Sequence, residues 1–288
     1  MKLGRKDYTI SVKTGTDANK AKFKKECVQG EIYHATDTGF FYIAEVTAGA
    51  SDATLSKFGA SAFTNQYSVS FDGTDDYMSV PSNASLNTSG DWSFSCWLYA
   101  DDLSQFKALV ARRSGGNSWQ ISVNASSSLD LYLFSAASAQ FQSNSTLSTG
   151  QWFHVAFTVA VGVTDGVKMY INGTVQSNTG TTSTSSNNAN YGMTFGDNTR
   201  SRFWNGELDE IAMFHTALSA SDIATLRGGA SAGTLGLPAD ISSLNPVAWW
   251  RMGDGTEAGS GTTVYDMSEN SNNGTLTNGP TYSTSVPS

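Results

Sequence analysis

The feature that most constrains this chain is a series of short apolar runs between residues 66 and 227, separated by turns rich in Gly, Ser, Thr and Asn. After an opening alternation of Tyr67, Val69 and Phe71, the runs are WSFSCWLYA, KALVARR, WQISVNA, LDLYLFS, WFHVAFTVAV, VKMYING, GMTFGD and LDEIAMF. Short strands at such even spacing are typical of a two-sheet sandwich. The sequence therefore predicts an all-β domain with antiparallel sheets.

Composition agrees with this prediction. The 288 residues include 28 Gly but only 5 Pro, and 39% are hydrophobic against 15% charged. Such a chain can bury one large β core and still carry smaller flanking segments. One helix is expected, in SASDIATLRG, with Ser221 as its N-cap and Gly228 at its end.

The first segment, residues 1–60, predicts a β-hairpin. Ile32 and Tyr33 precede an Asp-Thr-Gly turn, and Phe41 and Ile43 follow it. A lone hairpin is marginally stable in water, so it needs a partner from this chain or from another copy. Residues 48–61, rich in Ala, Ser and Gly, are the expected linker.

The distribution of charged residues and cysteines limits the kinds of partner that the chain is expected to bind. Eight of the 17 Lys and Arg lie in the first 25 residues, which carry +6 while the remainder carries −14, as expected of an arm that docks on an acidic surface or of a solvated basic end. Cys27 and Cys96 fall in different segments and are predicted to be free thiols. No export signal and no apolar run near about 18 residues is seen, so a membrane partner is not expected.

Five phrases in fixed order carry a family resemblance: SFDGTDDYMSVP, WSFSCWLYA, QWFHVAFTV, KMYINGTVQ and FWNGELDEIAMFHTALSASDI. Together they resemble a laminin-G-like, concanavalin A-like jelly roll, which implies that fold for residues 61–230. The tail from Asn245 resembles a phrase that in this family stands before the first strand. Residues 231–288 are therefore either a C-terminal strand addition that packs on the jelly roll or the start of a truncated repeat.

A second resemblance lies in GEIYHATDTGFFY, which is similar to a short element of bacteriophage virion and tail-fibre proteins. It implies a non-enzymatic virion structural protein that attaches by residues 1–60 to capsid or tail proteins, as a homotrimer, and displays the jelly roll on the particle surface as a decoration protein, head fibre or tail fibre. Surface polysaccharide is an expected partner and nucleic acid is not. The alternatives are a secreted or cell-surface carbohydrate-binding module and, third, a glycoside hydrolase.

The hydrolase alternative depends on Glu207-Leu208-Asp209-Glu210-Ile211. Strand geometry predicts that Glu207, Asp209 and Ile211 share one face, so the third acid of the hydrolase pattern is replaced by Ile211. Two carboxyls can form a retaining pair, but the phrase without the third acid resembles the non-catalytic branch of the family. No catalytic residue is predicted, and His154 is expected to be structural.

Glycan binding would need exposed aromatic rings near polar groups. The candidates are Trp119, Tyr191 and Trp204, with Tyr132 and Phe203 also available. The polar loop 179–192 either faces a ligand or is a surface excursion.

Calcium is the cofactor that the family resemblance implies, with Asp72 and Asp209 as its ligands. The competing interpretation is that Asp72 and Asp75 only shape a turn through bonds to the backbone.

Overall fold

The computed structural model describes residues 12–15, 32–35, 40–45, 54–60, 63–112, 118–134, 139–177, 191–197 and 202–288. The chain divides into two compact units, Met1–Thr64 (unit 1) and Asn65–Ser288 (unit 2). Most of the basic segment 1–25, Cys27, the Asp-Thr-Gly turn and residues 179–190 of the polar loop lie outside the described residues. The described part contains no helix long and apolar enough to span a membrane.

Unit 1 contains a four-stranded sheet in the order β1 (Val12–Gly15), β2 (Ile32–Ala35), β3 (Phe40–Glu45) and β4 (Thr54–Ala60). The antiparallel pair β2–β3 confirms the predicted hairpin, while β1 adds to β2 in parallel. The linker prediction is wrong for β4, which pairs with β3. This pairing satisfies backbone groups that a lone hairpin would leave free along the edge of β3.

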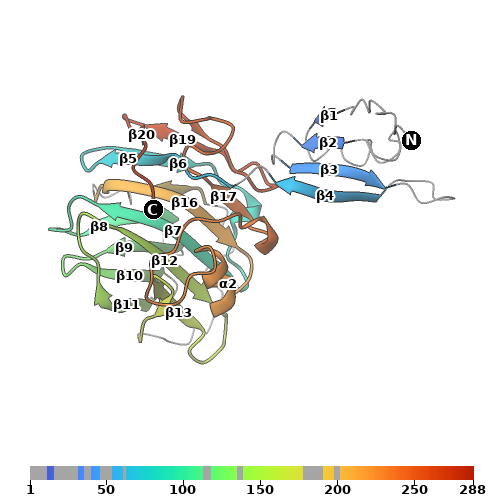
Figure 1. The fold of residues 1–288 in the computed structure, drawn as a ribbon. Helices are drawn as coiled ribbons and strands as arrows, with labels where there is room; N and C mark the ends of the chain where they lie inside the picture. The colour runs from blue at the N-terminus through green and yellow to red at the C-terminus, as the bar shows by residue number, and fades with distance from the viewer. Residues whose placement is uncertain are drawn as a thin grey trace, which may run out of the picture. The chain divides into compact units, whose positions relative to one another are not determined.

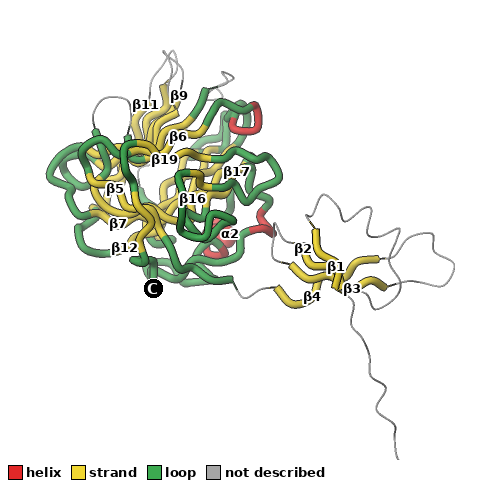
Figure 2. Tube along the Cα trace, turned by 90° about the horizontal axis from the view of Figure 1, so that it is seen from above, coloured by secondary structure: helices red, strands yellow, loops and turns green. Residues whose placement is uncertain are grey.

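Unit 2 consists of two antiparallel sheets of eight strands each, which confirms the predicted sandwich (Figure 1). The β10 sheet contains, in order, β11 (Ala139–Thr146), β10 (Ser128–Phe134), β9 (Ser118–Val123), β8 (Lys107–Arg112), β15 (Met193–Phe195), β6 (Tyr77–Val80), β19 (Gly274–Thr277) and β18 (Thr263–Val264). The β7 sheet contains β14 (Thr174–Val175), β13 (Val167–Ile171), β12 (Trp152–Val159), β7 (Trp92–Ala100), β16 (Asn205–Phe214), β5 (Ser68–Asp72) and β20 (Thr281–Ser283), with β17 (Ala248–Trp250) paired to β16. Strands dominate the described residues of this unit, in which helix is confined to α2 (Ala220–Thr225) and the single turns Ala84–Leu86 and Ser242–Leu244 (Figure 2).

The core lies between the two sheets and follows the period of two that the strands impose. Leu129, Leu131 and Leu133 of β10 and Phe94 and Leu98 of β7 all belong to one buried cluster. Removing each such side chain from water contributes about 1.5–3 kcal/mol. Cys96 is also in the cluster as a free thiol, and its burial raises the thiol pKa.

The C-terminal residues complete both sheets. Strand β19 pairs with β6, and β20 pairs with β5, so the last strands of the chain lie against the first strands of the sandwich (Figure 1). The strand-addition interpretation of residues 231–288 is therefore confirmed. A truncated repeat is excluded because these strands belong to the same two sheets as the jelly roll.

A β-bulge in β16 corrects the predicted faces of this strand. Asp209 pairs with Trp97 and Ala212 with Ser95, so two residues of β16 oppose one of β7. Glu210, at φ 44°, is the extra residue. Ile211 consequently lies in the core and does not share a face with Asp209.

The N-cap of helix α2 lies two residues earlier in the chain than predicted. Its N-cap is Ser219, not Ser221, because Ser219 and Asp222 form a capping box in which each side chain accepts from the other's backbone N–H. Each such cap contributes about 1 kcal/mol. The helix buries Ile223.

Arg227 follows the helix and holds the segment after it in place. Its guanidinium is buried and donates to the backbone carbonyls of Asn172, Ala230, Ser231 and Thr234. A Cβ at Gly173 would overlap this guanidinium, so glycine is required there for close packing.

His154 is fully buried on the outer face of the β7 sheet, in the structural role predicted for it. Ser95 Oγ lies 2.8 Å from Nε2, Trp97 makes an edge-on ring contact at 5.1 Å, and Nδ1 is buried without a hydrogen bond. Burial, with a smaller contribution from the Arg227 charge, lowers the pKa of His154 to about 3. The ring is therefore neutral in the folded protein over most of the acidic range.

We expect His154 to make the fold acid-sensitive between about pH 6.5 and 3. The unfolded chain binds a proton on this ring near pH 6.5 and the folded chain only near pH 3, so stability is lost as the pH falls, by on the order of 1.4 kcal/mol per unit. Urea unfolding of wild type, His154→Gln and His215→Gln across this range provides the measurement. The difference between His154→Gln and wild type should shrink with falling pH, whereas the exposed His215 control should track wild type; a constant difference for His154→Gln would contradict the assignment.

Candidate functional site

The outer face of the β10 sheet carries polar side chains that alternate with the core leucines. The side chains of Asp130 and Tyr132 lie on the outer face of β10, because Leu129, Leu131 and Leu133 occupy the face that is directed to the core. Register places Asp130 beside Ser122 of β9, and Tyr132 between Gln120 of β9 and Gln140 of β11. Three neighbouring strands thus present hydroxyl, amide and carboxyl groups to one surface, which we call the β10 face.

Asp130 is the buried centre of the β10 face. Its side chain is 0% exposed and accepts hydrogen bonds from Asn124 Nδ2 at 3.2 Å, Tyr132 Oη at 3.2 Å and Gln140 Nε2 at 3.3 Å. Burial raises the pKa of Asp130, and the three donors oppose that shift. The carboxyl therefore orients the side chains around it.

Aromatic rings stand next to this carboxyl. Tyr132 and Phe106 are half-buried, with ring centroids 6.3 Å apart, and the Arg202 guanidinium lies 4.0 Å from the centre of the Phe106 ring. Gln140 Nε2 also donates to Tyr132 Oη at 2.8 Å. Burial, followed by the nearby Asp130 charge, raises the pKa of Tyr132, so its hydroxyl remains protonated.

This arrangement suits a polyhydroxylated ligand. Aromatic rings can pack against the apolar C–H face of such a ligand, while the exposed Gln140 amide and the Tyr132 hydroxyl exchange hydrogen bonds with its hydroxyls. Asp130, Tyr132 and Gln140 sit on paired strands, so the sheet sets their spacing, whereas Phe106 and Arg202 lie in the loops before β8 and β16.

Two of the three predicted glycan platforms are placed elsewhere. Trp119 and Trp204 are both 0% exposed in the core, where Trp119 stacks on Trp92 at 4.9 Å. Their prediction as exposed platforms is wrong because each indole packs between the sheets. Tyr191 is half-buried, as Phe203 is.

Four residues of the β10 face were not predicted from the sequence: Asp130, Gln140, Phe106 and Arg202. A signal for Asp130 existed, because in LDLYLF the polar residues alternate with leucines. The pairing of Gln140 with Tyr132 and the seat of Arg202 on Phe106 depend on contacts between distant segments, which no local pattern reveals.

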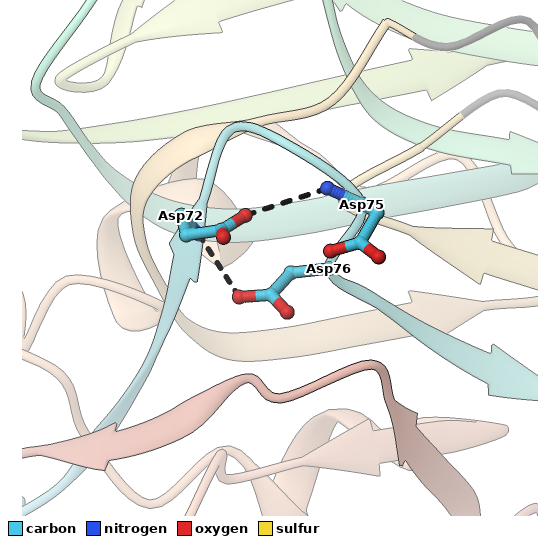
Figure 3. Close-up of side chains that lie close together, drawn as sticks. All are labelled: Asp72, Asp75 and Asp76. Carbon is cyan, nitrogen blue, oxygen red and sulfur yellow. Dashed lines mark hydrogen bonds between the residues drawn. The ribbon is translucent and has the colours of Figure 1, made fainter.

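The predicted calcium ligands do not come together. Asp72 pairs in the sheet with Asn205, four residues before Asp209, which places the two acids about 13 Å apart along the strand. Asp72 instead lies with Asp75 and Asp76, with one oxygen of each carboxylate within 4.8 Å of the others (Figure 3). The prediction that Asp72 and Asp209 share one calcium ion is therefore wrong, and the candidate ligands are Asp72, Asp75 and Asp76.

The cluster is held by the turn that begins the jelly roll. Asp72 Oδ1 accepts from the backbone N–H of Thr74 at 2.7 Å. It also accepts from that of Asp75 at 3.4 Å, and Asp76 Oδ2 accepts from that of Asp72 at 3.0 Å (Figure 3). The pKa of Asp76 is raised by burial first and then by its two acidic neighbours. An all-oxygen set of this kind fits a hard cation such as Ca²⁺, and the turn bonds are also those of the competing structural interpretation.

Glu207 and Asp209, the acids of the hydrolase alternative, differ in access. Asp209 is fully buried and accepts from Asn65 Nδ2 at 2.8 Å, and burial together with the Glu210 charge holds its pKa well above the usual value. Glu207 is half-buried. An enclosed Asp209 cannot meet a substrate as nucleophile or acid in this conformation.

Comparisons with known proteins identify the fold family. A family model described as the concanavalin A-like lectin/glucanases superfamily matches residues 72–224, more than half of the chain. A protein from Bacteroides ovatus, described as a candidate carbohydrate binding protein, aligns with a TM-score of 0.60 at 17% identity over 91% of this chain and 72% of that chain. Domain 4 of AbnA, an extracellular arabinanase from Geobacillus stearothermophilus solved with arabinotriose, aligns with a TM-score of 0.47 at 25% identity over 55% and 75% of the two chains. No curated protein matches the chain.

We expect calcium to stabilise the protein through Asp72, Asp75 and Asp76. Binding to the folded state alone stabilises it by about 2.7 kcal/mol at a hundredfold excess over the Kd. Thermal unfolding of wild type, Asp75→Asn and the exposed control Glu269→Gln, each with and without calcium, provides the measurement. The shift should be lost only in Asp75→Asn; equal behaviour of all three proteins would favour the turn-shaping role.

Proposed function

Because the chain belongs to the concanavalin A-like lectin/glucanase superfamily, we propose that it is a non-catalytic carbohydrate-binding protein whose β10 face holds the glycan. The observation that carries this proposal is the network of Asp130, Tyr132 and Gln140 on adjacent strands beside the Phe106 ring. It combines an aromatic surface with oriented donors and acceptors, as sugar recognition requires.

The non-catalytic part of the proposal is supported by the state of the acids. Hydrolysis by a retaining mechanism needs two carboxyls about 5–5.5 Å apart on either side of the scissile bond. The two candidate acids were Glu207 and Asp209. Asp209 is buried and hydrogen-bonded to Asn65, so only Glu207 is in contact with solvent. On the β10 face, Asp130 is occupied by three donors and serves to orient them.

We expect Tyr132→Ala to weaken glycan binding by at least about tenfold. Removing a ring that packs on the ligand costs on the order of 1.4 kcal/mol or more. A screen of neutral and acidic oligosaccharides would first identify a ligand, and titration calorimetry would then compare wild type, Tyr132→Ala and Asp130→Asn. Tyr265→Ala, at a tyrosine that is 38% exposed elsewhere on unit 2, is the matched control. Equal affinity of Tyr132→Ala and wild type would remove the β10 face from the proposal.

A second proposal concerns unit 1. Its sheet is a compact unit apart from the jelly roll, and its outermost strands β1 and β4 offer backbone groups for pairing with other chains. This supports attachment and oligomerisation through residues 1–60. The proposed setting, a homotrimer bound to capsid or tail proteins on a phage particle, depends on the N-terminal motif, and the comparisons favour carbohydrate binding without bearing on a virion.

We expect the full-length chain to be a trimer and residues 65–288 to be a monomer, because edge pairing around a closed axis stabilises short strands. Light scattering after size exclusion measures both masses. A monomeric full-length chain would contradict oligomerisation through unit 1, and a trimeric 65–288 fragment would move the interface to the jelly roll.

A further inference from the structure

A row of five cross-strand neighbours crosses the outer face of the β7 sheet. The register aligns Trp152, Tyr99, Glu207, Ser70 and Thr281 on β12, β7, β16, β5 and β20. Each alternates along its strand with a residue directed to the core, so all five point away from it. The first four are half-buried and Thr281 is exposed.

This row lies where the cover of the outer face ends. The adjacent row, His154, Trp97 and Asp209, has exposures of 0%, 1% and 0%. Two residues further along the same strands, side chains are again in contact with solvent. The row of five residues is therefore in contact with solvent, whereas the adjacent row on the same face of the sheet is buried.

Glu207 carries a charge that nothing described in the protein neutralises. Its Oε2 is buried without a hydrogen bond, and the ion pairs between described residues, Lys107–Asp102 and Arg251–Glu210, do not involve it. Burial, followed by the Asp101 charge, raises its pKa. One oxygen of this carboxylate has lost its contact with water and has no hydrogen bond in exchange. A cation bound at the exposed side of the carboxylate would therefore stabilise its charged form.

The surroundings add to the negative potential. Asp101 donates its backbone N–H to Asn205, and Asn205 pairs with Asp72, so these two exposed acids stand beside Glu207 at the same end of the sheet. Clustered charges of one sign raise the local concentration of oppositely charged ligands.

The aromatic pair next to Glu207 supplies an apolar and cation-attracting surface. The Tyr99 and Trp152 rings are 5.7 Å apart and inclined at 56°, and both are half-exposed. Such rings pack against the C–H face of a sugar and attract ammonium groups within about 6 Å of their centres. With Oε2 enclosed, Glu207 cannot offer both oxygens to a guanidinium fork, which favours the compact ammonium.

We propose that Trp152, Tyr99 and Glu207 form a second ligand site, on the face opposite the β10 face, for an amino sugar with a free primary ammonium group. The sugar ring packs on the two aromatic rings and the ammonium group binds the Glu207 carboxylate. The site shares no residue with the β10 face, so either proposal can fail while the other stands.

Titration calorimetry with a fully deacetylated glucosamine oligosaccharide tests the proposal on the full-length chain. Glu207→Gln keeps the shape of the side chain and should weaken binding by at least about tenfold, since the amide can accept a hydrogen bond but carries no charge to attract the ammonium group. Trp152→Ala should weaken it similarly, and Glu269→Gln and Tyr265→Ala should leave it unchanged. Thermal unfolding of each variant verifies that it is folded.

Two further probes decide the ligand class. The N-acetylated oligosaccharide, which lacks the ammonium group, should bind at least about tenfold more weakly than the amine. A lysine-containing peptide supplies the ammonium without a sugar ring and should bind more weakly than the amino sugar. Equal binding of the acetylated sugar, stronger binding of the peptide, or wild-type affinity in Glu207→Gln would each overturn the proposal.

Discussion

Backbone pairing between the two ends of unit 2 is the constraint on which the rest of the jelly roll depends. Strands β5 and β6 begin the domain and receive β20 and β19 from its end. Side chains reinforce the closure, because Ser68 Oγ donates to the carbonyl of Ser285 and the backbone N–H of Tyr67 donates to Asp254. Without the last strands, both sheets would expose unpaired edges beside the core.

Both outer faces carry buried polar residues, and they differ in which side chains stay accessible. On the β7 sheet, helix α2 and the segment held by Arg227 belong to a region in which His154, Trp97 and Asp209 are wholly buried. On the β10 sheet, Tyr132 and Phe106 stay half-exposed beside a hydrogen-bonded carboxyl. The two proposed ligand sites therefore lie on the β10 face and on the partly exposed border of the β7 sheet.

Strand alternation explains most of what could be predicted. The leucines of LDLYLF face the core, and Asp130 and Tyr132 face outward, as a period of two requires. The same rule places Trp119 on the core face with Ile121 and Val123. The prediction of Trp119 as an exposed glycan platform was therefore inconsistent with the alternation of strand β9. The rule failed for Ile211 because the bulge at Glu210 shifts its face, and a bulge depends on the partner strand β7.

The sequence by itself determined the fold class, the strand runs and the N-terminal hairpin, because alternation and turn residues act over a few neighbouring positions. Only the tertiary structure decided which polar groups meet. Pairing of Asp72 with Asn205 kept Asp72 away from Asp209, and Glu207 came to stand beside Tyr99 and Trp152. The physical reason is that register between distant strands is set by the sum of long-range hydrogen bonds and core packing, which no local segment contains.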